Sequence, residues 1–422
     1  MVDTRGLSLD QAPPIHLPLR FFLTAPWFVV AAGLILAVQG EAAMASRWTP
    51  AALAATHLLA IGFLGQVLCG ALLQLLPVIA GTPMPGVGLI ATASNLCLSA
   101  GSAFLAVGFL GGAPLWLGAG ALVSGVGFLT LLSGLLPALR RARGGPATLV
   151  AFRLGSVSLA LTVLLGLTLA AGLLGWLTLP RFTDWVTAHL SWGLLGWVGL
   201  LIVGVAYQVV PLFHVTPAYP GWMAAGLAPS LFLALAAATL ALWAGQGALA
   251  DLALTVAALG FVSFAAVTLI LQSRRSRPRL DATLVHWWLA MVAMAVAGVA
   301  WWLDAPSGLL GVLILIGVGV GLPSGMLLKI VPFLCWFHLQ SRWAASDRRD
   351  LRVPHMHQLL PERLARWHPP AHALALVLLC AGTLEPALVQ PGALVLCASA
   401  LWLVGLMAGV AWRYRRVSQA LG

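Results

Sequence analysis

Charged residues are scarce in this sequence. Asp, Glu, Lys and Arg make up 8% of the 422 residues, hydrophobic residues make up 61%, and the mean hydropathy is +1.00. An average soluble domain carries about 25% charged residues. A chain this apolar lacks the polar surface that water requires, so its composition excludes a soluble enzyme, a nucleic-acid-binding domain and a disordered protein. It is typical of a polytopic membrane protein embedded in the lipid bilayer.

Cysteine motifs are also lacking. None of the five cysteines belongs to a Cys-x-x-Cys pair, which argues against a disulfide framework or a zinc site. All lie in or near apolar segments and are interpreted as small core residues with inert thiols: Cys69, Cys97, Cys335, Cys380 and Cys397. Residues 1–19 lack the basic region and cleavage site of a signal peptide, so we expect the first helix to remain in the mature protein.

Long apolar runs, by contrast, are abundant. A membrane span needs about 20 mostly apolar residues. Twelve segments qualify: 21–39, 51–79, 87–110, 114–138, 150–179, 184–213, 222–244, 250–272, 282–303, 307–336, 371–390 and 392–412. We therefore expect an all-α membrane protein with twelve transmembrane helices, forming a single transmembrane domain over residues 1–422.

The distribution of arginine predicts the orientation. The N-terminal tail, the even-numbered connections and the C-terminal tail contain 19 of the 21 arginines, and the other side contains only Arg47 and Arg181. The 19 are Arg5, Arg20, Arg140, Arg141, Arg143, Arg153, Arg274, Arg275, Arg277, Arg279, six between 342 and 366, Arg413, Arg415 and Arg416. The positive-inside rule places both termini in the cytoplasm, in a bacterial inner membrane. The long connection 337–370 is then a cytoplasmic loop and a candidate contact for a partner subunit.

A short pattern occurs three times. Gly-x3-[Gln/Lys]-x2-Pro spans Gly70–Pro77, Gly204–Pro211 and Gly325–Pro332, at the ends of the second, sixth and tenth predicted spans. Glycine allows close helix approach, and proline ends or kinks the helix. The spacing predicts three pseudo-repeats of four helices, over about 20–140, 150–272 and 281–413, related by an axis along the membrane normal.

Two histidines lie at similar depth in matching spans. His57 and His189 are each about 10 Å below the expected outer surface, at 1.5 Å per helical residue. An imidazole inside a membrane indicates a functional site by default, and it ligates haem iron or other metals. The alternative is that each histidine packs between helices and bonds to a neighbouring carbonyl. The third unit has no histidine at the corresponding place.

A second polar set lies toward the expected cytoplasmic side. Gln74, Gln208 and Lys329 occupy the polar position of the repeated pattern. Either they converge into a ring that binds an anion, a haem propionate or a quinone carbonyl, or Lys329 merely extends to the interface. Further metal-ligand candidates are His214, His286, His338, His355 and His357, the last two forming a His-x-His chelate pattern.

Together, twelve spans, cytoplasmic termini, three four-helix units and His57 in the outer part of the second span resemble subunit I of the haem–copper oxidases. That superfamily includes the catalytic subunits of nitric oxide reductases. The resemblance covers nearly the whole chain in architecture and implies that His57 matches a low-spin haem ligand and His189, approximately, a copper ligand. The family's adjacent histidine pair in the seventh span and His-x-His in the tenth are absent. The resemblance thus implies a divergent, stand-alone relative without the binuclear centre.

The chain is also similar, in size and histidine content, to twelve-span haem- and copper-containing membrane proteins linked to nitric oxide stress.

The leading hypothesis is a haem-binding redox protein in which His57 and His189 ligate haem b, with copper as a further cofactor. The haem would be non-covalent, because no Cys-x-x-Cys-His motif is present. Its roles would be electron transfer with a quinol or cytochrome, or binding of NO or O2. The alternatives are a transporter or channel for a small solute, metal or haem, and a non-catalytic subunit of a larger complex. The sequence does not decide whether the protein is an enzyme, and nucleic acid is not an expected partner.

Overall fold

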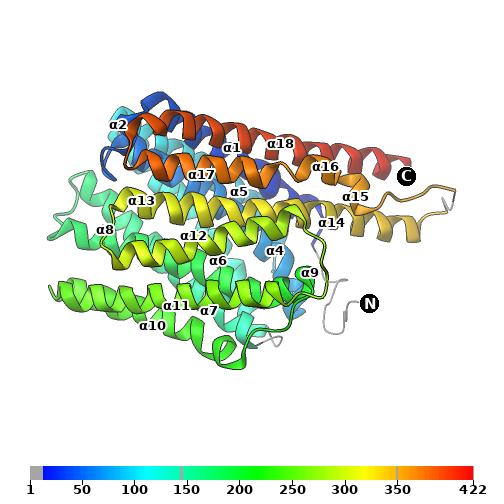
Figure 1. Cartoon of the computed structure of the whole chain (residues 1–422), viewed down its shortest axis with the longest axis horizontal. Coiled ribbons are helices and arrows are strands. Elements are labelled where there is room, and N and C mark those ends of the chain that lie inside the picture. The colour runs from blue at the N-terminus through cyan, green and yellow to red at the C-terminus, as the bar shows by residue number, and fades with distance from the viewer. Residues whose placement is uncertain (1–12, 143–145, 348–349, 422) are drawn as a thin grey trace.

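The computed structural model describes residues 13–142, 146–347 and 350–421, and every regular element within these ranges is a helix. The uninterrupted helices are α1 (His16–Gln39), α2 (Glu41–Met44), α5 (Val87–Gly111), α6 (Pro114–Arg141), α7 (Pro146–Leu173), α10 (Gly221–Trp243), α11 (Gly247–Ser273), α12 (Ala282–Trp302), α15 (Met356–Leu359), α16 (Glu362–Ala365), α17 (His368–Gly382) and α18 (Val389–Ala420). The long helices run side by side in one bundle (Figure 1). Arg5, Arg143 and positions 348–349 of the predicted loop lie outside the described residues.

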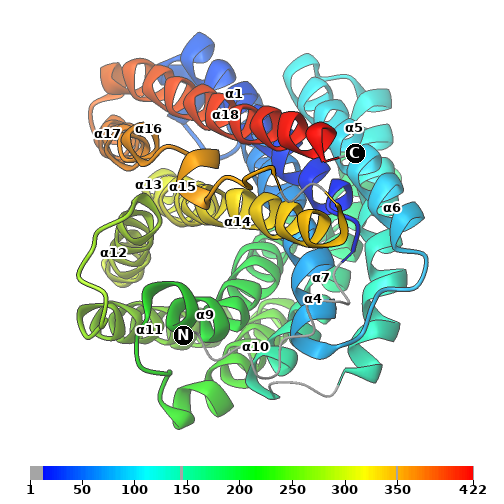
Figure 2. The same cartoon turned by 90° about the vertical axis from the view of Figure 1, so that its right-hand side faces the viewer.

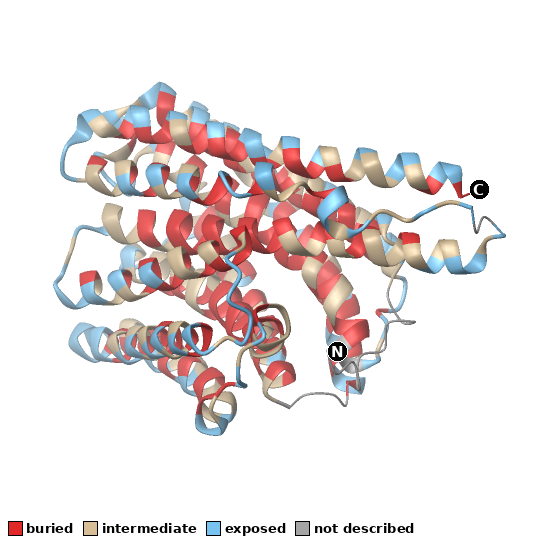
Figure 3. Ribbon diagram, turned by 45° about the vertical axis from the view of Figure 1, so that its right-hand side comes forward, coloured by how far each residue is buried: buried red, intermediate tan, exposed pale blue. Residues whose placement is uncertain are grey.

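Eleven helical segments of the described chain are long and apolar enough to cross a membrane. The protein is therefore an all-helical, multi-pass membrane protein, as its composition predicts. Large apolar side chains on the outside of the bundle, such as Val38, Leu89 and Leu115, are more than three-quarters exposed, as expected of a surface that faces lipid. Figure 3 shows the buried residues gathered between the helices and the exposed ones on outward faces and connections.

The predicted span 371–390 differs from the structure. Its helix, α17, has only 15 residues and ends at Gly382, and the chain then forms a short 3-10 turn, η5 (Pro386–Leu388). Proline at 386 disfavours helical backbone at Glu385, which explains the early end. The predicted loop 337–370 also differs, because helix continues to Ala345 before the short α15 and α16.

Three spans contain a π-helical segment. The first runs through α3 (Pro50–His57), η2 (Leu58–Gly65) and α4 (Gln66–Ala80); the second through α8 (Phe182–Leu190), η3 (Ser191–Gly199) and α9 (Leu200–His214); the third through α13 (Ser307–Gly311), η4 (Val312–Val320) and α14 (Gly321–Ala345). The π segments end at residues 65, 199 and 320, each five residues before Gly70, Gly204 and Gly325. Wide helical turns are rare and are frequent at functional sites.

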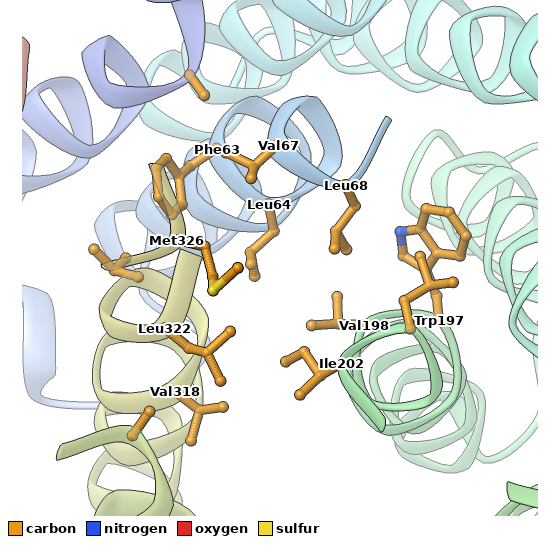
Figure 4. Close-up of a cluster of buried hydrophobic side chains, with 14 of the residues drawn as sticks. Phe63, Leu64, Val67, Leu68, Trp197, Val198, Ile202, Val318, Leu322 and Met326 are labelled. Carbon is orange, nitrogen blue, oxygen red and sulfur yellow. The ribbon is translucent and has the colours of Figure 1, made fainter. Parts of the chain in front are cut away.

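These three spans meet at the centre of the bundle. Figure 4 shows apolar side chains from each pointing toward a common space: Leu64 and Leu68; Val198 and Ile202; Val318, Leu322 and Met326. The first and third of these spans approach closely, since a Cβ on Gly319 would lie 3.0 Å from Cδ1 of Leu64. The other helices surround this core, and α1 packs against α18, so the first and last long helices are neighbours (Figure 2).

Candidate functional site

His57 and His189 each stand just before a π segment. His57 is the last residue of α3, and His189 is the second-last of α8. Nδ1 of His57 lies 2.8 Å from the Leu53 carbonyl oxygen, and Nδ1 of His189 lies 3.0 Å from the Thr162 carbonyl oxygen. A carbonyl accepts only from N–H, so both rings carry their proton on Nδ1. In each ring Nε2 is then a free lone-pair donor, with no hydrogen bond from the described residues.

Both side chains belong to one region of the bundle. They are half-buried, and each lies near the start of its span, at the same end of the bundle. The His57 ring lies against Phe109 of α5, with centroids 5.0 Å apart. The His189 ring lies against α7, where a Cβ on Gly166 would be 2.9 Å from Cε1 of the imidazole. Glycine at 166 therefore leaves the room that this ring occupies.

This donor set fits a haem iron. Metal-ligating histidines almost always donate the second ring N–H to a carbonyl or carboxylate, which fixes the ring and leaves the other nitrogen as ligand. His57 and His189 both have that arrangement, and they supply the imidazole that haem iron accepts. The same hydrogen bonds are also those of two helix-packing histidines, so haem binding stays a prediction at this point.

The three residues of the predicted polar ring, Gln74, Gln208 and Lys329, have different surroundings in the structure. Nζ of Lys329 donates to Oδ2 of Asp281 at 2.9 Å, and Nε2 of Gln208 donates to Oγ1 of Thr148 at 3.2 Å. Each side chain thus contacts the start of the first helix in its own predicted unit. Gln74 is half-buried, and no contact joins it to the other two among the described residues. Convergence of the three into one site stays a prediction.

The pKa of Asp281 depends on its burial and on its partners. Burial alone would raise the pKa of Asp281. The Lys329 ammonium and its hydrogen bond, the Leu284 amide and His214 act in the opposite direction and bring the pKa below its ordinary value. Asp281 is therefore ionised at neutral pH and forms a true ion pair with Lys329.

The other predicted metal ligands are dispersed. His214 is buried at the end of α9, with Nδ1 3.1 Å from Nε2 of Gln272, and Val215 after it has a positive φ of 54°. His338 lies in α14, with Nδ1 2.9 Å from the Tyr414 hydroxyl. His355 and His357 are exposed, and His355 caps α15. In the part of the chain that the structure describes, no group of three or more His, Cys, Asp or Glu is already set to hold a metal ion.

His286 alone among these candidates has histidine neighbours. It contacts His368 and His372 of α17, two residues that the sequence interpretation did not single out. Nε2 of His286 lies 2.8 Å from Nδ1 of His368, and all three side chains are buried. The sequence does contain one indication of this cluster: His368 and His372 are four residues apart, a spacing that places both on one face of a helix.

A second buried polar contact was also not anticipated. Gln66, directly after the first π segment, exchanges hydrogen bonds with Asn95 of α5: Nε2 donates to the Asn95 carbonyl at 3.1 Å, and Asn95 Nδ2 donates to Gln66 Oε1 at 2.9 Å. Ser99 accepts a further bond from Gln66 at 2.8 Å. This fully paired group joins two helices and has the character of a structural contact.

The five cysteines are free, and three of them are buried: Cys69, Cys335 and Cys397. The comparisons with known proteins do not extend this description: no family model matches the chain, and neither does any curated protein.

Proposed function

We propose that the protein binds b-type haem in the outer half of the membrane, where His57 and His189 would hold the iron. The single observation that carries this is the matched hydrogen bonding of their Nδ1 atoms to backbone carbonyls, which leaves two unprotonated Nε2 atoms in one region. Their matching positions, each just before a π segment, support a shared role. With two imidazoles a haem iron supports electron transfer, and with one it can bind NO or O2.

The chain's own residues would hold and orient the group. The Leu53 and Thr162 carbonyls hold the ring protons on Nδ1, which leaves Nε2 of each ring as the ligand atom. Phe109 packs on one imidazole, and Gly166 leaves room for the other. Copper is a second proposed cofactor. A quinol or a cytochrome is the proposed electron donor.

We also propose that α17 makes a twelfth crossing and that the fold is three four-helix units, similar to haem–copper oxidase subunit I. The described ends of the chain lie toward the same end of the bundle, which requires an even number of crossings (Figure 1). In all three central spans the π segment ends five residues before the glycine of the repeated pattern, and this equal spacing supports the repeat. So do two matching bonds: Thr148 Oγ1 donates to the Gly204 carbonyl at 3.0 Å, and Thr283 Oγ1 donates to that of Gly325 at 2.9 Å.

The proposed location is a bacterial inner membrane with cytoplasmic termini. One end of the bundle carries Arg140, Arg153, Arg274 and Arg413, and the opposite end carries Arg47 and Arg181. The connection that follows Ala345 is then cytoplasmic and is the proposed contact for a partner subunit.

The test is the visible spectrum of the detergent-purified protein, oxidised and dithionite-reduced. We expect a Soret band and a b-type α band that are lost or shifted in His57→Leu and in His189→Leu. His16→Ala is the matched control, because that histidine is exposed at the start of α1. A colourless, monodisperse protein from a haem-sufficient host overturns the proposal and favours a transporter or a non-catalytic subunit.

A finer variant separates ligation from packing. Gly166→Ala keeps both histidines but puts a methyl against the His189 ring. We expect a shifted band with haem retained, whereas Gly111→Ala, where nothing lies within 4 Å, leaves the spectrum unchanged. Identical spectra for the two alanine variants would contradict ligation by His189.

A further inference from the structure

The contact among His286, His368 and His372 forms a second polar site, on other helices than His57 and His189. The ring centroid of His286 lies 4.9 Å from that of His368 and 5.5 Å from that of His372. The three side chains have exposed fractions of 0%, 2% and 1%. Three imidazoles buried in direct contact inside a membrane protein require a reason, because each carries polar nitrogen atoms into an apolar interior.

Hydrogen bonding within the protein satisfies only half of these nitrogens. His286 Nε2 pairs with His368 Nδ1, and His368 Nε2 lies 3.4 Å from the Ser399 hydroxyl. Nδ1 of His286 and both ring nitrogens of His372 are buried without a hydrogen bond of normal geometry, although the Ile316 carbonyl lies near His372. Buried groups left in this way commonly have a water or an ion as partner.

The space beside the trio limits the size of that partner. A cavity of about 10 Å³ lies beside two of the three rings: His368 and His372 of α17 border it, together with Ser324 of α14, Ser399 of α18 and six apolar residues. A volume of about 10–15 Å³ is what a single water needs. The partner is therefore one water or one ion, and a haem or quinone does not fit there.

The donor set decides which ion suits it. Neutral imidazoles are good ligands for copper and zinc, whereas magnesium and calcium prefer oxygen donors. No carboxylate or thiolate is hydrogen-bonded to these three rings among the described residues, so the charge of the ion is not neutralised. Because the cost of burying an ion rises with the square of its charge, a monovalent ion is favoured over a divalent one.

We propose that His286, His368 and His372 bind one Cu⁺ ion. The rings are at present turned to pair with each other, so binding requires the His286–His368 nitrogens to separate from 2.8 Å to about 3.5 Å, the spacing of two ligands in a three-coordinate site with metal–nitrogen bonds of about 2 Å. The donating ring of that pair moves its proton to its other nitrogen. Both imidazoles thereby stay neutral, and no proton leaves the site. His372 supplies the third nitrogen.

The experiment loads the purified full-length protein anaerobically with Cu⁺, competes it against bicinchoninate, and measures copper per chain by mass spectrometry. We expect about one retained Cu⁺ in the wild type and loss of it in His286→Asn and in His372→Leu. The matched control is His214→Leu, since His214 is also buried with an unpartnered Nε2 but has no histidine beside it. Parallel loading with Zn²⁺ tests the preference for the monovalent ion.

X-ray absorption of the copper-loaded wild type provides a readout that does not depend on any variant folding. Imidazole scattering from two or three ligands supports the site. No retained Cu⁺, scattering without imidazole, or equal copper in the wild type and the His286→Asn variant overturns it. The haem bands measured on the same samples keep the two proposals apart, because His286→Asn leaves them unchanged and His57→Leu leaves the copper content unchanged.

Discussion

Lys329, the only lysine in the chain, donates from Nζ to Oδ2 of Asp281 at 2.9 Å. The other carboxylate oxygen of Asp281 accepts from the Leu284 amide at 2.9 Å and so caps α12. One carboxylate therefore ties α14 to the first turn of α12. Gln208 makes the corresponding contact in the preceding unit, where it donates to Thr148 near the start of α7.

The Lys329–Asp281 pair predicts a dependence of stability on pH. The pKa of Asp281 is lower in the folded protein than its ordinary value, so its ionisation favours the folded state above that ordinary value of about 3.9. This contribution is lost as the pH falls through the lowered pKa. In Lys329→Gln the half-buried carboxylate loses its counter-charge, and we expect a lower Tm at neutral pH.

The measurement is thermal unfolding followed by tryptophan fluorescence, for which the 18 tryptophans give ample signal. We expect the difference in Tm between wild type and Lys329→Gln to be largest near pH 7 and to shrink as the pH falls toward the ordinary pKa of Asp. The control is Lys329→Gln with Asp281→Asn, which removes both charges and recovers part of the loss. A difference that does not change with pH would contradict the ion pair.

Much of the fold follows from the sequence because hydrophobic length is such a strong signal in a membrane protein. Eleven predicted spans overlap the apolar helices of the structure, and the start of α12 at residue 282 is predicted to the residue. The exception, α17, has the right composition but is shortened by Pro386. The π segments could not be predicted, since hydrophobic length separates a span from a connection but does not distinguish an α-helical turn from a π-helical one.

The sites were only partly predictable. Depth along a span identified His57 and His189, because that quantity can be counted from the sequence. The His286 cluster depends on which face α17 turns toward α12, which periodicity within one helix does not determine. The repeat position of Lys329 was recognised, but its partner Asp281 was not, since ion pairing between distant helices leaves no trace in the local sequence.

Gly204 tests the close approach that the repeated pattern implies. A Cβ at this position would lie 2.8 Å from Cβ of Ala151 and 3.2 Å from the Phe152 ring. We expect Gly204→Ala to push α9 from α7 and to lower stability by about 1–3 kcal/mol, the usual range for overpacking. It would also lengthen the bond from Thr148 to the Gly204 carbonyl.

The matched control for this variant is Gly405→Ala in α18, another helical glycine with nothing within 4 Å of the added methyl. Unfolding in a denaturing detergent, monitored by tryptophan fluorescence, compares the two variants with the wild type. Gly405→Ala is expected to be at least as stable as the wild type, because alanine favours helix over glycine. Equal effects of the two substitutions would show that α7 and α9 tolerate separation.

The orientation is tested by labelling single added cysteines with a membrane-impermeant maleimide. Thr178 and Ser276 are both exposed, in the connections between α7 and α8 and between α11 and α12, at opposite ends of the bundle. Four arginines accompany Ser276, at 274, 275, 277 and 279, so the positive-inside rule places this connection in the cytoplasm.

We expect Thr178→Cys to react once the outer barrier is permeable and Ser276→Cys to react only after the inner membrane is opened. The wild type, with its five buried or half-buried cysteines, gives the background. The reverse labelling would invert the topology and move His57 and His189 to the cytoplasmic half, where a periplasmic cytochrome could no longer be their electron donor.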